Sequence, residues 1–391
     1  MAKAPRRRGT VYYSDAKGKW IAMLPAGPDG KRPYRTADTQ AEAVELIKQL
    51  EAERAAGRDL SRKAETVKEL VQAHLDAIGG QQRPSTRQVA ATRGRHITNA
   101  IGAMKIDMVT LETVQGLANK LIKGLSPVVA RGVLQLLHSA YEAVIPERMS
   151  RNPVDWKRLR LRKATLTERR PLDDDQVRAL LAAADDQVAR GASVRYAIAW
   201  WLAVFAGLRR GEFAGLTWRD VDWKKAELHI RTQVALAEDG TYQTGQDLKT
   251  DESRRTIPIG PRLLARLRTH WEAQQAERKL RGVAWKEHGA VVCDEHGAPI
   301  TDLNILNNRL ARLARAAKLP HVHPHLLRHT CATLISEEGY SEAVIASILG
   351  HRKRGSTTIR YTHASERASR AAMMAIEARI LGAAEAAKEA R

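Results

Sequence analysis

The sequence predicts a multidomain protein that is mainly α-helical and contains small β-sheets. The chain has 391 residues, which is long enough for two or three domains that each bury a core. Alternating polar and apolar residues mark the beginning of the chain and one later stretch, whereas helical spacing marks most of the rest. Lysine and arginine total 65 against 44 acidic residues, and this net charge of +21 favours a polyanionic partner, with nucleic acid as the leading candidate.

Residues 1–62 are predicted to form a small three-stranded sheet that carries one helix. Strands are indicated by the alternating segments GTVYYSD, KWIAMLP and KRPYRTAD, and the helix by TQAEAVELIKQLEAERAAG. Such a module could solubilise or oligomerise the protein, or its sheet could lie on DNA. The DNA-binding interpretation depends on six basic residues: Arg6, Arg7, Arg8, Lys31, Arg32 and Arg35.

Residues 64–150 are predicted to form a domain of four helices. The first helix has apolar residues on one face, at Val67, Leu70, Val71, Leu75 and Ile78. The other three are indicated by QVAATRGRHITNAI, TLETVQGLANKLI and PVVARGVLQLLHSAYEAVI.

Residues 151–170 are predicted to be a basic linker between two domains. Two interpretations remain open, because a charge run is usually a solvated face but could also follow a phosphate backbone. The candidate DNA contacts in this segment are Lys157, Arg158, Arg160, Arg162 and Lys163.

Residues 171–391 are predicted to form a mixed α+β domain, mostly helical and interrupted by one small sheet. Helices are indicated by PLDDDQVRALLAAA and by YAIAWWLAVFAG, which is too short to cross a membrane and is typical of a buried core helix. The sheet is indicated by AELHIRTQVAL, GTYQTGQDLK and SRRTIPI. The beginning MAKAPRRRG has no apolar signal segment, and Cys293 and Cys331 are too few for a disulfide framework, so we expect a cytoplasmic protein.

Several residues of this last domain could carry chemistry on a phosphate group. Arg209 follows the apolar helix, and Lys249 lies at the turn of the predicted hairpin. His325 and Arg328 are three residues apart at the beginning of a helix, an arrangement that favours anion binding. His351 follows a glycine that is predicted to end a helix, and Tyr361 comes ten residues later. A phenol with a pKa near 10 is a poor nucleophile at neutral pH, so Tyr361 needs help from these cations.

A metal site is the weaker interpretation of the histidines. Four of them are close together, at His321, His323, His325 and His329. Catalytic zinc takes about three ligands in a defined geometry, and no carboxylate or cysteine completes an obvious set here. We therefore expect no metal.

The ordered motifs GLRRGE, KT followed by RTIPI, HLLRH, LGH and TTIRYTH resemble those of the tyrosine recombinases of the phage integrase family. The resemblance implies a helical core-binding domain at residues 64–150 and a catalytic domain at 171–391, with a looser likeness of residues 1–62 to an arm-binding domain. It implies that Tyr361 attacks a DNA phosphodiester and forms a 3'-phosphotyrosine, with Arg209 and Arg328 on the phosphate. By the same resemblance, His351 would donate to a non-bridging oxygen, His325 would assist proton transfer and Lys249 would protonate the leaving 5'-oxygen.

The resemblance further implies site-specific integration or excision of a phage or mobile element, without a cofactor. The expected partners are double-stranded attachment sites, a homotetramer on DNA, and an accessory bending protein or excisionase. Residues 370–391, with an apolar stripe at Met373, Ile376, Ile380 and Ala384, are expected to dock on a neighbouring chain. The alternatives are a type IB-like topoisomerase, a catalytically inactive DNA-binding regulator on the same fold, and a metal-dependent nuclease.

Overall fold

A computed structural model describes most of the chain, and the contacts divide it into two compact units, Met1–Leu166 and Thr167–Arg391. Among the described residues, the buried apolar side chains form two clusters in the first unit and one in the second. The described residues are 9–26, 30, 32–55, 65–146, 148–161, 170–189, 194–248, 253–350 and 362–382.

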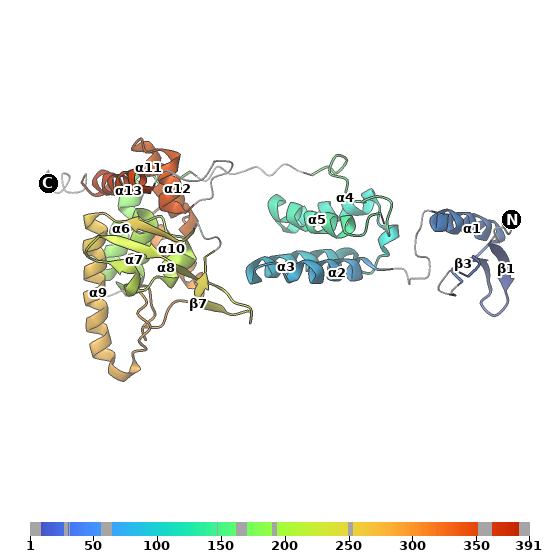
Figure 1. Cartoon of the computed structure of the whole chain (residues 1–391), viewed down its shortest axis with the longest axis horizontal. Helices are drawn as coiled ribbons and strands as arrows, with labels where there is room; N and C mark the ends of the chain where they lie inside the picture. The colour runs from blue at the N-terminus through green and yellow to red at the C-terminus, as the bar shows by residue number, and fades with distance from the viewer. Residues whose placement is uncertain are drawn as a thin grey trace. The chain divides into compact units, whose positions relative to one another are not determined.

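The first module is an antiparallel sheet with one helix across it (Figure 1). Ala22 and Ala37 of the sheet, together with Ala43 and Leu50 of the helix, are buried in its core. This confirms the predicted sheet-plus-helix module. Its elements are β1 (Thr10–Ser14), β2 (Lys19–Met23), β3 (Tyr34–Ala37) and α1 (Gln40–Ala55).

The next module is the predicted set of four helices, and their beginnings follow from local sequence. Thr66 accepts a hydrogen bond from the Glu69 backbone while the Glu69 side chain accepts from Thr66, which satisfies N–H groups that the helix itself leaves unpaired. Tyr141 is fully buried and donates to the carbonyl of Ile106 at 3.1 Å. The helices are α2 (Val67–Gly79), α3 (Pro84–Ile101), α4 (Leu111–Gly124) and α5 (Pro127–Glu142), with a 3-10 turn at Ile106–Met108.

The first half of the expected basic linker packs against these helices. Val154 and Leu159 are buried in the same cluster as the helices. The backbone N–H of Arg160 donates to Gln115 at 2.8 Å, and the Gln115 amide donates to the Arg160 carbonyl at 3.0 Å. A connection that is free of the helical module therefore cannot begin before residue 161.

The second unit is built around α7, in which every residue from Ala197 to Phe205 is buried. This confirms the predicted core helix, and within the described residues no helix is both long and apolar enough to cross a membrane. The helices are α6 (Asp174–Ala189), α7 (Ala197–Phe205), α8 (Arg210–Gly215), α9 (Pro261–Arg281), α10 (Leu303–Ala316), α11 (Pro324–Glu337), α12 (Glu342–Leu349) and α13 (Thr362–Glu377), with a π-helical turn, η6, at Ala378–Gly382.

The strands of the second unit form two small sheets where the sequence predicted one. A three-stranded antiparallel sheet has the order β4-β5-β8, and β6 and β7 form a separate hairpin. The segment AELHIRTQVAL divides between them, because β5 pairs with β8 and β6 pairs with β7. The strands are β4 (Val221–Asp222), β5 (Glu227–Ile230), β6 (Thr232–Leu236), β7 (Tyr242–Asp247) and β8 (Arg255–Pro258).

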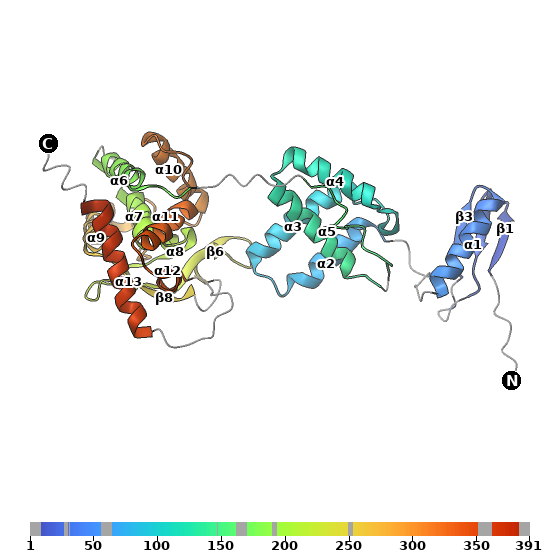
Figure 2. The same cartoon turned by 90° about the horizontal axis from the view of Figure 1, so that it is seen from above.

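The C-terminal helix α13 packs on its own chain, beside α12 and β8 (Figure 2). Met373, Ile376 and Ile380 are fully buried in the core of the second unit. The Glu377 carboxylate accepts the backbone N–H groups at the beginning of α9, from Arg262 at 3.0 Å and from Leu263 at 2.9 Å. The expectation that residues 370–391 dock on a neighbouring chain is thus corrected for residues 370–382, because the apolar stripe is already covered in cis. Ala384 lies outside the described residues.

Candidate functional site

Arg209 lies at the beginning of α8, directly after the turn that leaves the buried helix α7. Its Nη1 donates to Glu212 Oε1 at 2.6 Å, and its backbone N–H donates to Glu212 Oε2 at 2.9 Å. Its Nη2 donates to the carbonyl of Gly350 at 3.1 Å. The side chain is 35% exposed, so this fixed guanidinium still faces solvent.

Arg328 projects from α11 toward the same place. It donates to the carbonyl of Gly207 at 2.7 Å and to the carbonyl of Leu349. Leu349 directly precedes Gly350, whose carbonyl accepts from Arg209. The residue is only 2% exposed. Burial, together with the positive charge of Arg209, lowers the pKa of Arg328 to about 9, so the guanidinium remains charged at pH 7. The structure therefore brings Arg209 and Arg328 together at the end of α12.

Glu212 is fully buried among three arginines. Arg255 of β8 forms two hydrogen bonds with its carboxylate, at 2.9 and 3.2 Å, and Arg328 Nη1 lies 3.8 Å from it. Burial alone would raise the pKa of Glu212, but the charges and hydrogen bonds of Arg255 and Arg209 outweigh it and lower the pKa to about 2. The carboxylate is thus ionised at any working pH and supports the arginines.

Sequence reasoning assigned no role to Arg255. A signal was available, because Arg255 begins the RTIPI motif, but an arginine in a strand is usually solvent-exposed. Only the fold shows that its side chain is 5% exposed and reaches Glu212, which is 43 residues earlier.

His325 has a different environment from Arg328, although both lie on the first turns of α11. His325 is exposed, and its ring centroid lies 4.4 Å from that of His329 in an edge-on contact. The ring of His323 is nearly parallel to it at 6.5 Å. His325 is therefore accessible to a large partner, whereas Arg328 is part of the protein interior.

The other three expected site residues, Lys249, His351 and Tyr361, lie outside the described residues. The structure does describe Gly350, which precedes His351, and Thr362, which follows Tyr361. Gly350, whose carbonyl accepts from Arg209, directly precedes His351. It ends α12 in the left-handed conformation, with φ of 65°. Helix α13 begins at Thr362, directly after Tyr361.

Gly207 provides a test of how tightly this site is packed. Its φ is +59°, and an added Cβ would lie 2.4 Å from a methyl carbon of Leu349 and 3.2 Å from the sulfur of Cys331. We expect Gly207→Ala to destabilise the second unit by about 2–5 kcal/mol, from left-handed strain and overpacking. It should also displace the carbonyl that Arg328 binds and slow any reaction at the site.

Thermal unfolding of Gly207→Ala and an activity assay at a temperature where the variant is folded would measure both effects. Gly116→Ala in α4 is the matched control, because nothing lies within 4 Å of an added Cβ there. A Gly207→Ala protein with the wild-type melting temperature would contradict this view of the site.

The expected DNA contacts divide according to where the fold places them. Lys157, Arg158 and Arg160 are exposed, with the buried Leu159 anchoring them on the helical module. Arg35 pairs across the sheet with the fully buried Ala22, so the register places it on the face that α1 covers. Arg32 is described and exposed. Outside the described residues are Arg6, Arg7, Arg8, Lys31, Arg162 and Lys163.

The opposite face of the N-terminal sheet holds residues that the sequence analysis did not select. Tyr12 and Tyr34 are 41% and 50% exposed there. The ammonium of Lys17 lies 4.4 Å above the ring of Tyr34 and donates to its hydroxyl at 3.0 Å. Exposed aromatic rings beside a lysine can stack on bases and attract phosphates. This face is therefore a better candidate for nucleic-acid contact than the covered face, on which Arg35 lies.

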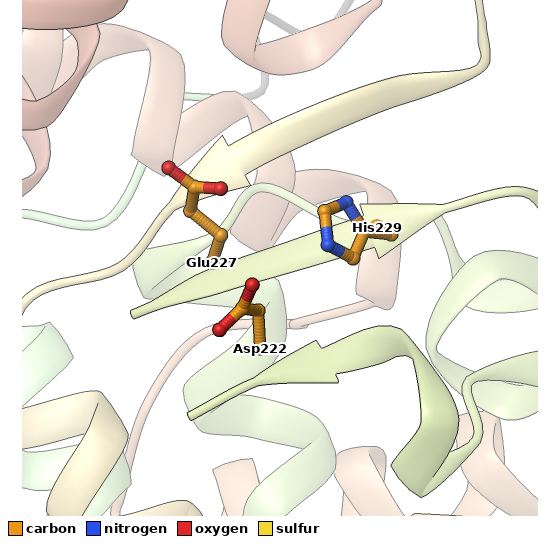
Figure 3. Close-up of side chains that lie close together, drawn as sticks. All are labelled: Asp222, Glu227 and His229. Atoms are coloured by element: carbon orange, nitrogen blue, oxygen red, sulfur yellow. The ribbon is translucent and has the colours of Figure 1, made fainter. Parts of the chain in front are cut away.

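Among the described residues, one group could offer ligands to a metal ion: Asp222, Glu227 and His229, on β4 and β5 (Figure 3). Their ligand atoms lie within 4.8 Å of one another. However, Arg370 of α13 already forms an ion pair with Glu227 at 2.6 Å, and Asp222 accepts two backbone N–H groups of the following turn. Because the Arg370 guanidinium already neutralises Glu227 and also donates to the carbonyl of Lys225, Glu227 anchors α13 on the sheet.

Known proteins resemble this chain over much of its length. An integrase of Streptomyces ambofaciens is 25% identical over 366 residues, which cover 90% of this chain and 91% of that protein. A XerC-like tyrosine recombinase of Caldanaerobacter subterraneus subsp. tengcongensis is 28% identical over 276 residues, which cover 66% of this chain and 68% of that protein.

Solved structures show that the fold is shared. The Tn1549 transposon integrase in complex with a circular intermediate DNA aligns with a TM-score of 0.63 at 19% identity, over 83% of this chain and 99% of that chain. The lambda integrase tetramer bound to a Holliday junction aligns with a TM-score of 0.55 at 16% identity, over 88% of this chain and 92% of that chain.

A model of the phage integrase family matches residues 170–367, half of the chain, and this range contains the site built by Arg209, Glu212 and Arg328. The match confirms the resemblance of the sequence motifs. The chain is therefore a member of the phage integrase family, and a tyrosine-type site-specific DNA recombinase.

Proposed function

We propose that Arg209 and Arg328 bind the DNA phosphodiester that Tyr361 attacks. The observation that carries this proposal is the convergence of the two guanidiniums, which donate to the adjacent carbonyls of Gly350 and Leu349. His351 follows directly in the chain. A guanidinium has five N–H groups, and the described hydrogen bonds from the side chains of Arg209 and Arg328 use two each, so donors remain for phosphate oxygens.

The reaction requires positive charge that is fixed before the substrate arrives. As the Tyr361 oxygen bonds to phosphorus and the bond to the 5'-oxygen breaks, negative charge gathers on the equatorial phosphate oxygens. Arginine stays charged and matches this planar geometry with paired N–H groups. His351 donates to a non-bridging oxygen, His325 assists removal of the tyrosine proton, and Lys249 protonates the leaving 5'-oxygen. The phosphotyrosine conserves the energy of the phosphodiester, so religation needs no nucleotide.

The remaining parts of the chain are proposed to hold the DNA. Residues 1–62 would bind arm-type sites through the exposed sheet face that carries Tyr12 and Tyr34, together with Arg32. Residues 64–150 would bind the core site, with Lys157 and Arg158 following the phosphate backbone. We further propose that four chains assemble on two attachment sites in the host cytoplasm, and that an accessory bending protein or excisionase sets the direction.

The test is a nicked suicide DNA substrate that carries the attachment site, incubated with the protein in EDTA. We expect a covalent protein–DNA adduct, and peptide mapping by mass spectrometry should place the nucleotide on Tyr361. The Tyr361→Phe protein is the control, because it keeps the ring and lacks only the hydroxyl. An adduct that persists in Tyr361→Phe, or cleavage that requires a metal ion, would contradict the proposal. Strand exchange between two duplexes separates a recombinase from a topoisomerase.

A further inference from the structure

Arg255 is a buried arginine at the beginning of β8 whose guanidinium is bonded on every side. Its Nη1 and Nη2 bind both oxygens of Glu212, at 3.2 and 2.9 Å. Its Nε donates to the carbonyl of Ile348 at 2.6 Å, and Nη1 also donates to the carbonyl of Ser253 at 3.1 Å. Four of its five N–H groups are therefore used inside the protein, whereas the described side-chain hydrogen bonds of Arg209 and of Arg328 use two each, so Arg255 has the least capacity left to bind a phosphate.

Two of these contacts reach distant segments that hold the proposed phosphate-binding arginines in place. Glu212 is the carboxylate that holds Arg209 at 2.6 Å. Ile348 lies in the last turn of α12, followed by the carbonyls that bind Arg328 and Arg209 and then by His351. The Ser253 carbonyl is only two residues away, so this bond holds the guanidinium against its own strand. One side chain thus links β8 to α8 and to the end of α12, which are far apart in the sequence.

The chemistry of this junction requires an arginine. The planar fork can meet both oxygens of a carboxylate while its Nε points elsewhere, which a lysine ammonium cannot do. The neighbouring Arg254 has no such role, because its side chain is 59% exposed and its ion pair is with Asp247, which is 79% exposed.

We propose that Arg255 is a positioning residue for DNA strand cleavage: it fixes the end of α12, whose carbonyls hold Arg209 and Arg328, relative to Glu212 without touching the DNA. This inference rests on the proposed function, because it assumes that Arg209 and Arg328 act on one phosphate. A misplacement of about an ångström at such a site typically costs on the order of 10²-fold in rate. Loss of Arg255 should therefore slow cleavage without weakening DNA binding.

The experiment uses the full chain with excess suicide substrate, so that each protein molecule reacts once. The rate constant of adduct formation then reports the geometry of the site, and the final amplitude reports the fraction of protein that is folded and active. Arg255→Gln and Arg255→Lys are compared with the wild type, and Arg254→Gln is the matched control. Arg255→Lys retains the positive charge beside Glu212, so the positioning role can still be tested with this variant if Arg255→Gln fails to fold.

We expect Arg255→Lys to lower the rate constant by about 10-fold and Arg255→Gln by about 10²-fold, following the usual cost of misplaced groups. The DNA dissociation constant should change by less than about threefold, and Arg254→Gln should react at the wild-type rate. A variant in which only the amplitude falls would show that Arg255 is merely structural and would overturn the inference. So would a wild-type rate in both Arg255 variants, which would leave the proposed function intact. A wild-type protein that forms no adduct would overturn both.

Discussion

Arg328→Gln should lower the rate of DNA strand cleavage by about 10²–10³-fold, because one preorganised cation at the developing phosphate charge typically supplies 3–4 kcal/mol. The same change should have little effect on stability. Burial and the charge of Arg209 lower the pKa of Arg328 to about 9, so the folded protein carries this charge at a free-energy cost. Glutamine removes that cost, which offsets the lost hydrogen bonds to Gly207 and Leu349.

Single-turnover cleavage and urea unfolding of the same Arg328→Gln preparation would measure the two effects separately. Arg254→Gln again serves as the control, since it removes one positive charge from an exposed position of the same unit. If Arg328→Gln lost several kcal/mol of stability and cleaved normally once folded, Arg328 would be a structural cation and the phosphate-binding role would be wrong.

Local patterns in the sequence predicted the features that depend on nearby residues, such as the buried helix and the motif arginines. The all-apolar run at residues 197–205 can only be stable when buried, and α7 is buried throughout. Arg209 and Arg328 were found because they stand in ordered motifs, and the fold brings them together. The part that failed depends on pairing between distant segments. Period-2 alternation cannot say that β5 pairs with β8 while β6 pairs with β7, so one sheet was expected in place of two.

Three other placements depend on pairing between distant segments in the same way. Arg35 looked like a DNA contact by charge, but its face of the sheet is set by its register opposite Ala22. Arg255 received no role from the sequence, because only the fold places it beside Glu212. The apolar stripe at Met373 and Ile376 predicts that this helix face is buried against another surface. Periodicity alone does not show whether that surface belongs to the same chain or to another.

Glu212→Gln should destabilise the catalytic unit by about 3–5 kcal/mol, because it leaves Arg209, Arg255 and Arg328 close together without their shared counter-charge. The rate of cleavage should also fall by at least about 10²-fold, since the guanidiniums would move apart and would no longer be placed to bind the same phosphate. Urea unfolding at pH 7 measures the first effect, and adduct formation with the suicide substrate measures the second.

The pH dependence of unfolding distinguishes loss of the buried charge from a simple packing defect. The pKa of Glu212 is about 2 in the folded protein against 4.5 as its ordinary value, so the ionised carboxylate contributes stability that is complete above pH 4.5 and is lost as the pH falls toward 2. The stability difference between wild type and Glu212→Gln should therefore shrink over that range.

Glu277→Gln is the matched control for the Glu212 experiment, because it removes a partly buried carboxylate that also pairs with two arginines, Arg195 and Arg281, in a network that does not include Glu212. We expect it to cost stability and to leave the rate of adduct formation unchanged. A Glu212→Gln protein that lost no more activity than Glu277→Gln would mean that the arginines hold their positions without Glu212, and that the carbonyls of Gly207, Leu349 and Gly350 suffice to hold Arg209 and Arg328 in place.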